Sequence, residues 1–273
     1  MTSTTVPAAT TRSAATTPDD TAHRVSFGRV VRSEAIKLFT LRSTWWSLGV
    51  TALLGIGISL MMASAIRDFG GGMPPTMAIV APMQFTMLVA GIFGAIAVTG
   101  EYSTGMIRST LTAQPRRGVV VAAKSLVVAL ALAATTIVAF AVAVVFVTMV
   151  LGADGLDWSD PEQTLVPLLW GVVSMATFAL LGLGWGFIIR NGAGAIAATV
   201  GVLFVLPIVL NLFAFGGEAW SWIVDLGQYL PASAAQVLTT PGAEGVTEAV
   251  VTLFAWPVAA IVLGWAVLRT RDA

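Results

Sequence analysis

Two aspartates in a short polar run are the residues that could most directly support acid–base chemistry. The run DGLDWSDPE, residues 154–162, contains Asp154 and Asp157, and a pair of carboxylates can act as general acid and general base when a pocket holds them. The run also resembles a calcium loop, but it lacks the glycine and the final glutamate of an EF-hand. Because no neighbouring segment predicts a scaffold for such a pocket, a membrane enzyme built on these aspartates is an alternative and not our main hypothesis.

Other reactive groups are missing from the sequence. It contains no cysteine, which excludes thiolate catalysis, iron–sulfur clusters and cysteine-based zinc sites. The single histidine, His23, lies in a polar tail, so neither an HExxH zinc site nor a Ser/His pair is available. No GxxxxGK[ST] loop occurs. We therefore predict that the chain is not an enzyme and binds no cofactor, metal or nucleotide by itself.

The composition indicates a membrane protein. Hydrophobic residues make up 57% of the chain, charged residues make up 10%, and the mean hydropathy is +0.89. About 20 apolar residues in a helix cross the hydrocarbon core of a bilayer. Six stretches qualify, at residues 44–66, 76–99, 119–151, 164–189, 193–215 and 247–268. Since these runs show no period-two alternation, we predict an all-α integral membrane protein with six transmembrane helices.

The basic residues predict how these helices are oriented. All fourteen Lys and Arg residues except Arg67 fall on one side of the six stretches, and loops rich in Lys and Arg stay in the cytoplasm. Both termini are therefore expected to be cytoplasmic, in a multi-pass protein of the cell membrane. Residues 1–22 are rich in Thr, Ala, Ser and Pro, which predicts a disordered cytoplasmic tail. Residues 24–273 then form one transmembrane domain.

No ionisable residue lies deep inside any of the stretches apart from Lys124, which is near the cytoplasmic start of the third. Ion-coupled carriers normally keep an ionisable group at depth, so an ion-driven secondary transporter is a second alternative. Pro82 and Pro207 interrupt the second and fifth stretches and can bend them, leaving carbonyls free. The candidate substrate path near these prolines consists of Gln84, Phe85 and Asn211.

An amphipathic segment precedes the first stretch. Residues 24–41 read RVSFGRVVRSEAIKLFTL, and helical spacing predicts one apolar arc formed by Phe27, Val31, Ala35 and Leu38. We expect a helix along the inner membrane surface, used as a lipid anchor or for docking another protein. Glu34 falls within the arc, where a carboxylate needs a partner. Lys37, three residues on, is the nearest candidate.

A second segment connects the second and third stretches. Residues 100–118 read GEYSTGMIRSTLTAQPRRG. Ser103 or Thr104 can cap a helix that ends before Pro115, with a short apolar face formed by Met106, Ile107 and Leu111. A short helix across the ends of two spans can pass movement from a soluble partner into the bilayer, although a plain basic loop is the alternative.

The last outer connection, residues 216–246, is rich in aromatic side chains. It contains Trp220, Trp222, Tyr229 and Pro231. Aromatic rings of this kind favour the headgroup level of a bilayer. The connection is expected either to anchor the protein at the interface or to gate an exit.

The order of these features resembles the permease subunits of ABC transporters, specifically the ABC type-2 permease family, over most of residues 24–268. The residues that carry the resemblance are Ser33, Glu34, Lys37 and Leu38, followed by Glu101, Gly105, Leu111, Pro115, Arg116 and Lys124. Met106 departs from the threonine that often follows the glycine in that family, and Gln114 departs from the pattern before the proline. Neither departure affects the fold, but both concern the coupling contacts.

The resemblance implies an exporter permease for a hydrophobic or amphiphilic substrate, such as a drug, an antibiotic or a lipid. In that family, ATP and Mg are bound by a partner nucleotide-binding subunit, and two such subunits pair with two permease copies, identical or different. No nucleic acid partner is expected. By the same resemblance, the residues that couple ATPase to permease are Glu34, Lys37, Glu101, Thr104, Gly105, Met106, Ile107, Arg108, Leu111, Pro115 and Arg116.

Overall fold

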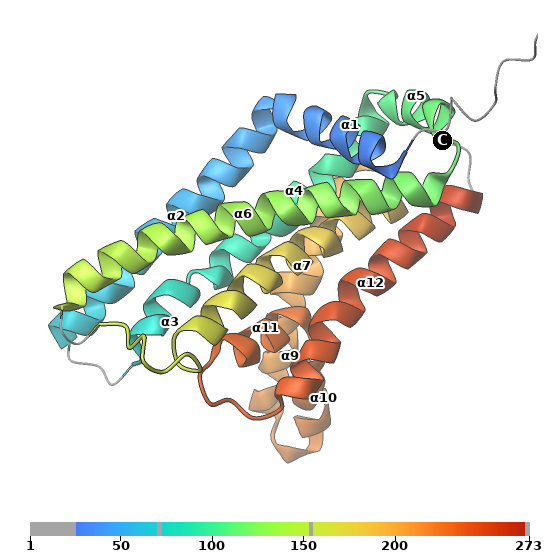
Figure 1. Cartoon of the computed structure of the whole chain (residues 1–273). Coiled ribbons are helices and arrows are strands. Elements are labelled where there is room, and N and C mark those ends of the chain that lie inside the picture. The colour runs from blue at the N-terminus through green and yellow to red at the C-terminus, as the bar shows by residue number, and fades with distance from the viewer. Residues whose placement is uncertain (1–25, 70–72, 153–154, 271–273) are drawn as a thin grey trace, which may run out of the picture.

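The structure, a computed structural model, describes residues 26–69, 73–152 and 155–270, and within these ranges the chain is mostly helical and has no strand (Figure 1). The predicted tail at residues 1–22, His23 and Asp154 lie outside the described residues. The first half contains α1 Phe27–Thr40, α2 Arg42–Phe69, α3 Pro75–Val80, α4 Met83–Ser103, α5 Met106–Ala113 and α6 Arg117–Leu151. The second half contains α7 Leu165–Ile189, α8 Gly192–Val200, η2 Gly201–Val205, α9 Leu206–Leu212, η3 Phe213–Gly216, η4 Glu218–Trp220, α10 Ser221–Asp225, η5 Leu226–Tyr229, α11 Pro231–Thr239 and α12 Val246–Thr270.

Among the described residues, six helical segments are long and apolar enough to cross a membrane, which confirms the predicted number. They are Arg42–Phe69, Pro75–Ser103, Arg117–Leu151, Leu165–Ile189, Gly192–Gly216 and Val246–Thr270. The third has 35 residues, or about 52 Å at 1.5 Å per residue, which exceeds the roughly 30 Å hydrocarbon core. It must therefore tilt or project, as predicted. The helices α1 and α5 lie at the same end of the bundle as the C-terminal end of α12 (Figure 1).

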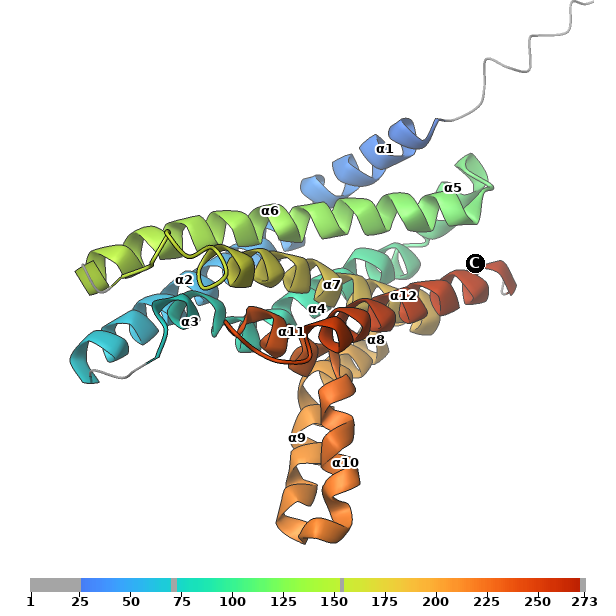
Figure 2. The same ribbon diagram turned by 60° about the horizontal axis from the view of Figure 1, so that its bottom comes forward.

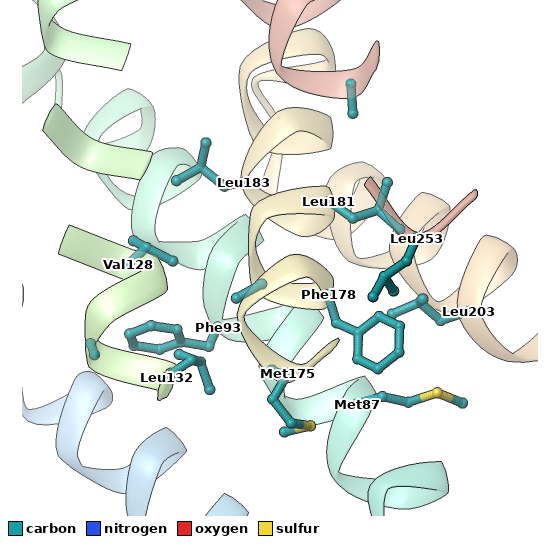
Figure 3. Packing of buried hydrophobic residues seen from close by; sticks show 14 of the residues in the cluster. Met87, Phe93, Val128, Leu132, Met175, Phe178, Leu181, Leu183, Leu203 and Leu253 are labelled. Atoms are coloured by element: carbon teal, nitrogen blue, oxygen red, sulfur yellow. The ribbon is translucent and has the colours of Figure 1, made fainter. Parts of the chain in front are cut away.

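The helix α7 is the centre of the bundle, packed against α4, α12 and α6. Glycines let the backbones of α4 and α7 touch. A Cβ atom added to Gly94 would lie 1.8 Å from the carbonyl oxygen of Ala179, and one added to Gly182 would lie 1.9 Å from that of Gly91. Small residues commonly permit such close approach between transmembrane helices. Larger side chains, with Phe178 of α7 among the most buried, fill the remaining space (Figure 3).

Each of the two prolines expected to bend a span stands where the regular α-helix is interrupted. Pro82 stands at the turn between α3 and α4, and the hydroxyl of Thr86 donates to its carbonyl oxygen at 3.3 Å. Pro207 follows the π-helical turn η2, in which the backbone N–H of Leu206 donates to the carbonyl of Gly201. A π turn and a proline are both recognised causes of a kink. The amide of Asn211 donates to the Pro207 carbonyl at 2.8 Å.

Beyond η2 the chain leaves the bundle. The segments from α9 to η5, residues 206–229, form a projecting hairpin (Figure 2), and none of these residues is buried. The chain then returns through α11, which packs against α12 and α7. At this return, the indole Nε1 of Trp256 donates to the carbonyl of Tyr229 at 2.8 Å. The connection 216–246 is thus built largely from short helices, and its aromatic rings lie on the projecting part.

Candidate functional site

A cluster of four charged side chains joins α1, α4 and α6. We call Glu34, Lys37, Glu101 and Lys124 the charge cluster. The ammonium of Lys37 contacts Glu34 Oε1 at 2.7 Å and Glu101 Oε1 at 3.2 Å, and it donates to the hydroxyl of Thr110 on α5 at 2.9 Å. The ammonium of Lys124 contacts Glu101 Oε1 at 2.8 Å and also bonds Glu34 Oε2. One network therefore links the short helix α5 to three longer helices.

The charge cluster is shielded from solvent and electrically balanced. Glu34 is 3% exposed, and Glu101 and Lys124 are each 5% exposed. Buried charges are tolerated only when they are paired and hydrogen-bonded, and two carboxylates face two ammonium groups here. Burial acts to raise the pKa of Glu34, but the charge and hydrogen bond of Lys124, with those of Lys37, hold that pKa below its ordinary value. Burial acts to lower the pKa of Lys37, but its contacts with Glu34 and Glu101 raise it.

The amphipathic pattern of α1 directs Glu34 into the bundle. Its buried residues are Val30, Glu34 and Leu38, spaced by four along one face. The predicted pairing of Glu34 with Lys37 is confirmed. The side of α1 that packs on the bundle differs from the predicted apolar arc at its first residue, because Phe27 is 47% exposed while Val30 is buried. The buried face is therefore rotated toward Val30, which places Glu34 at its centre.

The helix α5 is positioned by a glycine. Gly105, the residue before α5, has φ 72°, a left-handed conformation that glycine adopts at little steric cost. The predicted cap by Ser103 or Thr104 is wrong, because α4 continues to Ser103 and both hydroxyls donate back to the carbonyl of Gly100. Ile107 is 2% exposed, which fixes the inner face of α5.

The outer face of α5 is free of intramolecular packing. Arg108 and Thr112 are exposed and lie one turn apart, while Leu111 is partly buried against the main core. Met106, at the start of α5, lines a cavity beside the charge cluster. The predicted coupling residues thus divide into buried members that hold α5 and exposed members that a soluble partner could reach.

Two arginines bind the C-terminal end of α12 to the neighbouring helices. Arg117 and Arg190 donate to the carbonyls of Leu268 and Val267 in the last turns of α12, where a helix leaves carbonyls without partners. Pro115 and Arg116 lie apart from the charge cluster and line a hollow of about 360 Å³ with Arg117, Gly118, Trp265 and Arg269.

The predicted substrate-path residues do not form one site. Gln84 lines a small cavity of about 80 Å³ among α3, α4, α7 and α11. Phe85 is 57% exposed, and Asn211 lies exposed on the projecting hairpin. Neither Phe85 nor Asn211 is among the residues that line that cavity.

Asp157, the described member of the aspartate pair, has a structural use. Its carboxylate accepts hydrogen bonds from the hydroxyl of Ser159 at 2.6 Å and from its backbone N–H at 2.9 Å. These bonds lower the pKa of Asp157, which keeps it ionised in an exposed turn. In the described ranges no group of His, Asp and Glu side chains is arranged to hold a metal ion.

Sequence reasoning misses two members of the network. It includes Lys124 in the family pattern without assigning it a coupling role, and it omits Thr110. The available signal is that Lys124 is the one basic residue within a predicted span, because such a residue requires a buried partner. Thr110 gives no comparable signal, since threonine is common on helix surfaces.

A six-span helical bundle with an amphipathic helix and a short inter-span helix joined at one end is the architecture of a multi-pass membrane protein. The chain matches the model of the family described as ABC-2 family transporter protein over residues 8–273, and it belongs to that family. A comparison with curated proteins gives no significant match.

Proposed function

We propose that this chain is the permease subunit of an ATP-driven exporter that moves a hydrophobic or amphiphilic compound, such as a drug, an antibiotic or a lipid, across the cytoplasmic membrane. A separate nucleotide-binding subunit, present in two copies, binds ATP and Mg and hydrolyses ATP. Two permease copies, identical or different, form the pathway between them. Both termini, α1 and α5 face the cytoplasm.

The observation that carries this proposal is the bond between α5 and the charge cluster. Lys37 reaches Thr110 of α5 and the carboxylates of α1 and α4 at the same time, and Lys124 extends the network into α6. A displacement of α5 by a partner would therefore move the inner ends of three helices together. The exposed residues Arg108 and Thr112 provide the contact face.

A charge reversal on α5 tests the proposal. The permease is purified with its nucleotide-binding subunit, and retention of that subunit and ATP hydrolysis are measured in proteoliposomes. Arg108→Glu should reduce both, and more strongly at low salt than at high salt, because exposed charges are screened by ions. Arg67→Glu is the matched control, because Arg67 is exposed near the C-terminal end of α2. This variant should leave both quantities unchanged.

Two results would contradict the proposal. One is equal retention and equal ATP hydrolysis in the two charge-reversal variants. The other is ATP hydrolysis, or transport against a gradient, by the purified chain alone. Transport that persists after ATP depletion but stops with an ionophore would instead support an ion-coupled carrier.

A further inference from the structure

The hollow between the start of α6 and the end of α12 is strongly basic. It lies at the same end of the bundle as α1 and α5 (Figure 1). Its volume is about 360 Å³, and its lining consists of Pro115, Arg116, Arg117, Gly118, Trp265 and Arg269. Three of these residues are arginines and none is acidic. We call this site the basic hollow, and a hollow lined by charge of one sign concentrates ions of the opposite sign.

Two of these arginines lack a counter-charge. Arg116 and Arg269 are exposed, and neither forms an ion pair with a described residue. The guanidinium of Arg269 lies over the ring of Trp265, 4.8 Å from the ring centre. Arg117 adds a third positive charge, which its hydrogen bond to the carbonyl of Leu268 holds in this place. The charge cluster avoids repulsion by pairing opposite charges, whereas the basic hollow needs a bound anion to offset it.

The chemistry and the position of the basic hollow favour a phosphate group as this anion. Guanidinium groups bind phosphate through paired N–H donors. The hollow lies between the ends of two segments long enough to cross a membrane, Arg117–Leu151 and Val246–Thr270, and tryptophan, here Trp265, is enriched at the membrane interface. Basic pockets between transmembrane helices bind anionic lipid headgroups at that level.

We propose that the basic hollow binds an anionic phosphate group, which a phospholipid headgroup or a small soluble phosphate can supply. Arg116 and Arg269 donate hydrogen bonds to the phosphate oxygens, and the charge of Arg117 adds to the attraction. Because Arg116 precedes α6 and Arg269 belongs to α12, the bound phosphate joins the ends of these two helices. The site is formed within one copy of the chain, needs no nucleotide-binding subunit and goes beyond the proposed transport function.

Trp265 can report binding from the site itself. The full chain is prepared in maltoside micelles with isotope-labelled tryptophan and phosphate-free buffer, and its indole N–H resonances are followed by NMR. The Trp265 resonance is identified by its loss in Trp265→Phe. Short-chain phosphatidylglycerol, short-chain phosphatidylcholine and inorganic phosphate are then titrated separately. Trp158, exposed in the connection before α7, does not line the hollow and is the internal reference.

The Trp265 resonance of the unmodified chain should shift with phosphatidylglycerol and stay constant with phosphatidylcholine, whose headgroup has no net charge. Arg116→Gln and Arg269→Gln should each raise the phosphatidylglycerol concentration at the midpoint by roughly tenfold, because each removes a charge-assisted hydrogen bond. Arg32→Gln is the matched control. Arg32 is exposed on α1, at the same end of the bundle, but does not line the hollow, so its midpoint should be unchanged.

The titration with inorganic phosphate identifies the source of the phosphate group. A shift at concentrations as low as those of phosphatidylglycerol assigns the site to a soluble phosphate, whereas a shift with the lipid alone assigns it to a headgroup. Three results would overturn the proposal: no shift with either compound, an equal shift with phosphatidylcholine, or equal midpoints in Arg116→Gln, Arg269→Gln and Arg32→Gln. No ATPase is present in these titrations, so their outcome is independent of the proposed transport function.

Discussion

The charge cluster and the projecting hairpin are held in opposite ways. At the cluster, α1, α4 and α6 meet through buried ion pairs that involve Glu34, Glu101 and Lys124. The helix α5 joins them through the hydrogen bond from Lys37 to Thr110. In the hairpin, residues 206–229, no side chain is buried, and the chain leaves the bundle (Figure 2). One region is therefore fixed by contacts within the chain, while the other leaves its apolar surface for lipid or for a second protein.

Hydropathy does not distinguish the span that leads into the hairpin from a span packed inside the bundle. The fifth span, Gly192–Gly216, has a hydropathy of 2.5 and is 17% buried in its most apolar window, whereas the fourth, Leu165–Ile189, has a hydropathy of 2.0 and is 61% buried. In a bilayer the lipid is as apolar as leucine, so burial depends on close packing. Gly94 and Gly182 provide that packing for α7, while a Cβ on Gly201 would meet nothing.

The largest predicted effect is loss of one carboxylate from the charge cluster. Glu101→Leu leaves Lys37 and Lys124 to share the single carboxylate of Glu34, so one positive charge of the cluster is no longer balanced. Such a change typically lowers the free energy of unfolding by about 3–5 kcal/mol. Unfolding in mixed detergent, followed by circular dichroism, measures it.

A double variant checks that charge balance is the cause. Glu101→Leu with Lys124→Leu removes one charge of each sign and leaves the Glu34–Lys37 pair. Its unfolding free energy should be higher than that of Glu101→Leu alone. If the two substitutions are simply additive, the cluster does not act as one unit.

The next prediction compares a glycine packed between two helices with a glycine that faces open space. Gly94→Ala places a methyl group against the backbone of Ala179, so α4 and α7 must move apart, and overpacking of this kind lowers the unfolding free energy by about 1–3 kcal/mol. Gly201→Ala, at the base of the projecting hairpin, meets open space. It should be neutral or slightly stabilising, because alanine favours helix more than glycine does. Destabilisation of equal size at both positions would contradict the packing scheme.

A smaller effect follows from pH. Because the pKa of Glu34 in the folded chain lies below its ordinary value of 4.5, its stabilising contribution is complete above that value and is lost as the pH falls through the lowered pKa. The pKa of Lys37 is raised from 10.5, so its contribution is complete below that value and is lost as the pH rises through the raised pKa. Docking of α1 should therefore be constant between these limits.

Spin labels can measure this dependence, because the chain contains no cysteine. Labels at Arg32→Cys and Ser109→Cys occupy exposed positions on α1 and α5. Their separation should increase at acidic pH in the otherwise unmodified chain. In Glu34→Gln the acidic step should be absent; its persistence would assign the step to another group.

Local sequence patterns predict much of this fold but few of the long-range contacts that form the charge cluster. The spans follow from apolar length, and the Glu34–Lys37 pair follows from helical spacing. The contacts of Lys124 with Glu34 and Glu101 join residues 90 and 23 positions apart, and no local spacing specifies such pairs. The predicted cap at Thr104 failed because the left-handed turn at Gly105 ended one helix and began the next.

The projecting hairpin was beyond sequence reasoning for a different reason. Pro207 predicts a bend, but its direction depends on the π turn at Gly201–Val205 and on the absence of a packing partner there. The candidate path residue Asn211 lies on this hairpin, and its amide donates to the carbonyl of Pro207 in its own helix.

The smallest predicted effect concerns the hairpin itself. Trp222 is 60% exposed on α10, so Trp222→Ala should change the unfolding free energy of a single copy by no more than about 0.5 kcal/mol. By contrast, Leu253→Ala in α12, where the side chain is fully buried, should lower it by about 2–5 kcal/mol. If a second permease copy covers the hairpin, Trp222→Ala should instead reduce the dimer fraction, measured by crosslinking through Phe215→Cys. A large loss of stability in the single copy would mean that the hairpin packs onto its own bundle, and the contrast between the two regions would then disappear.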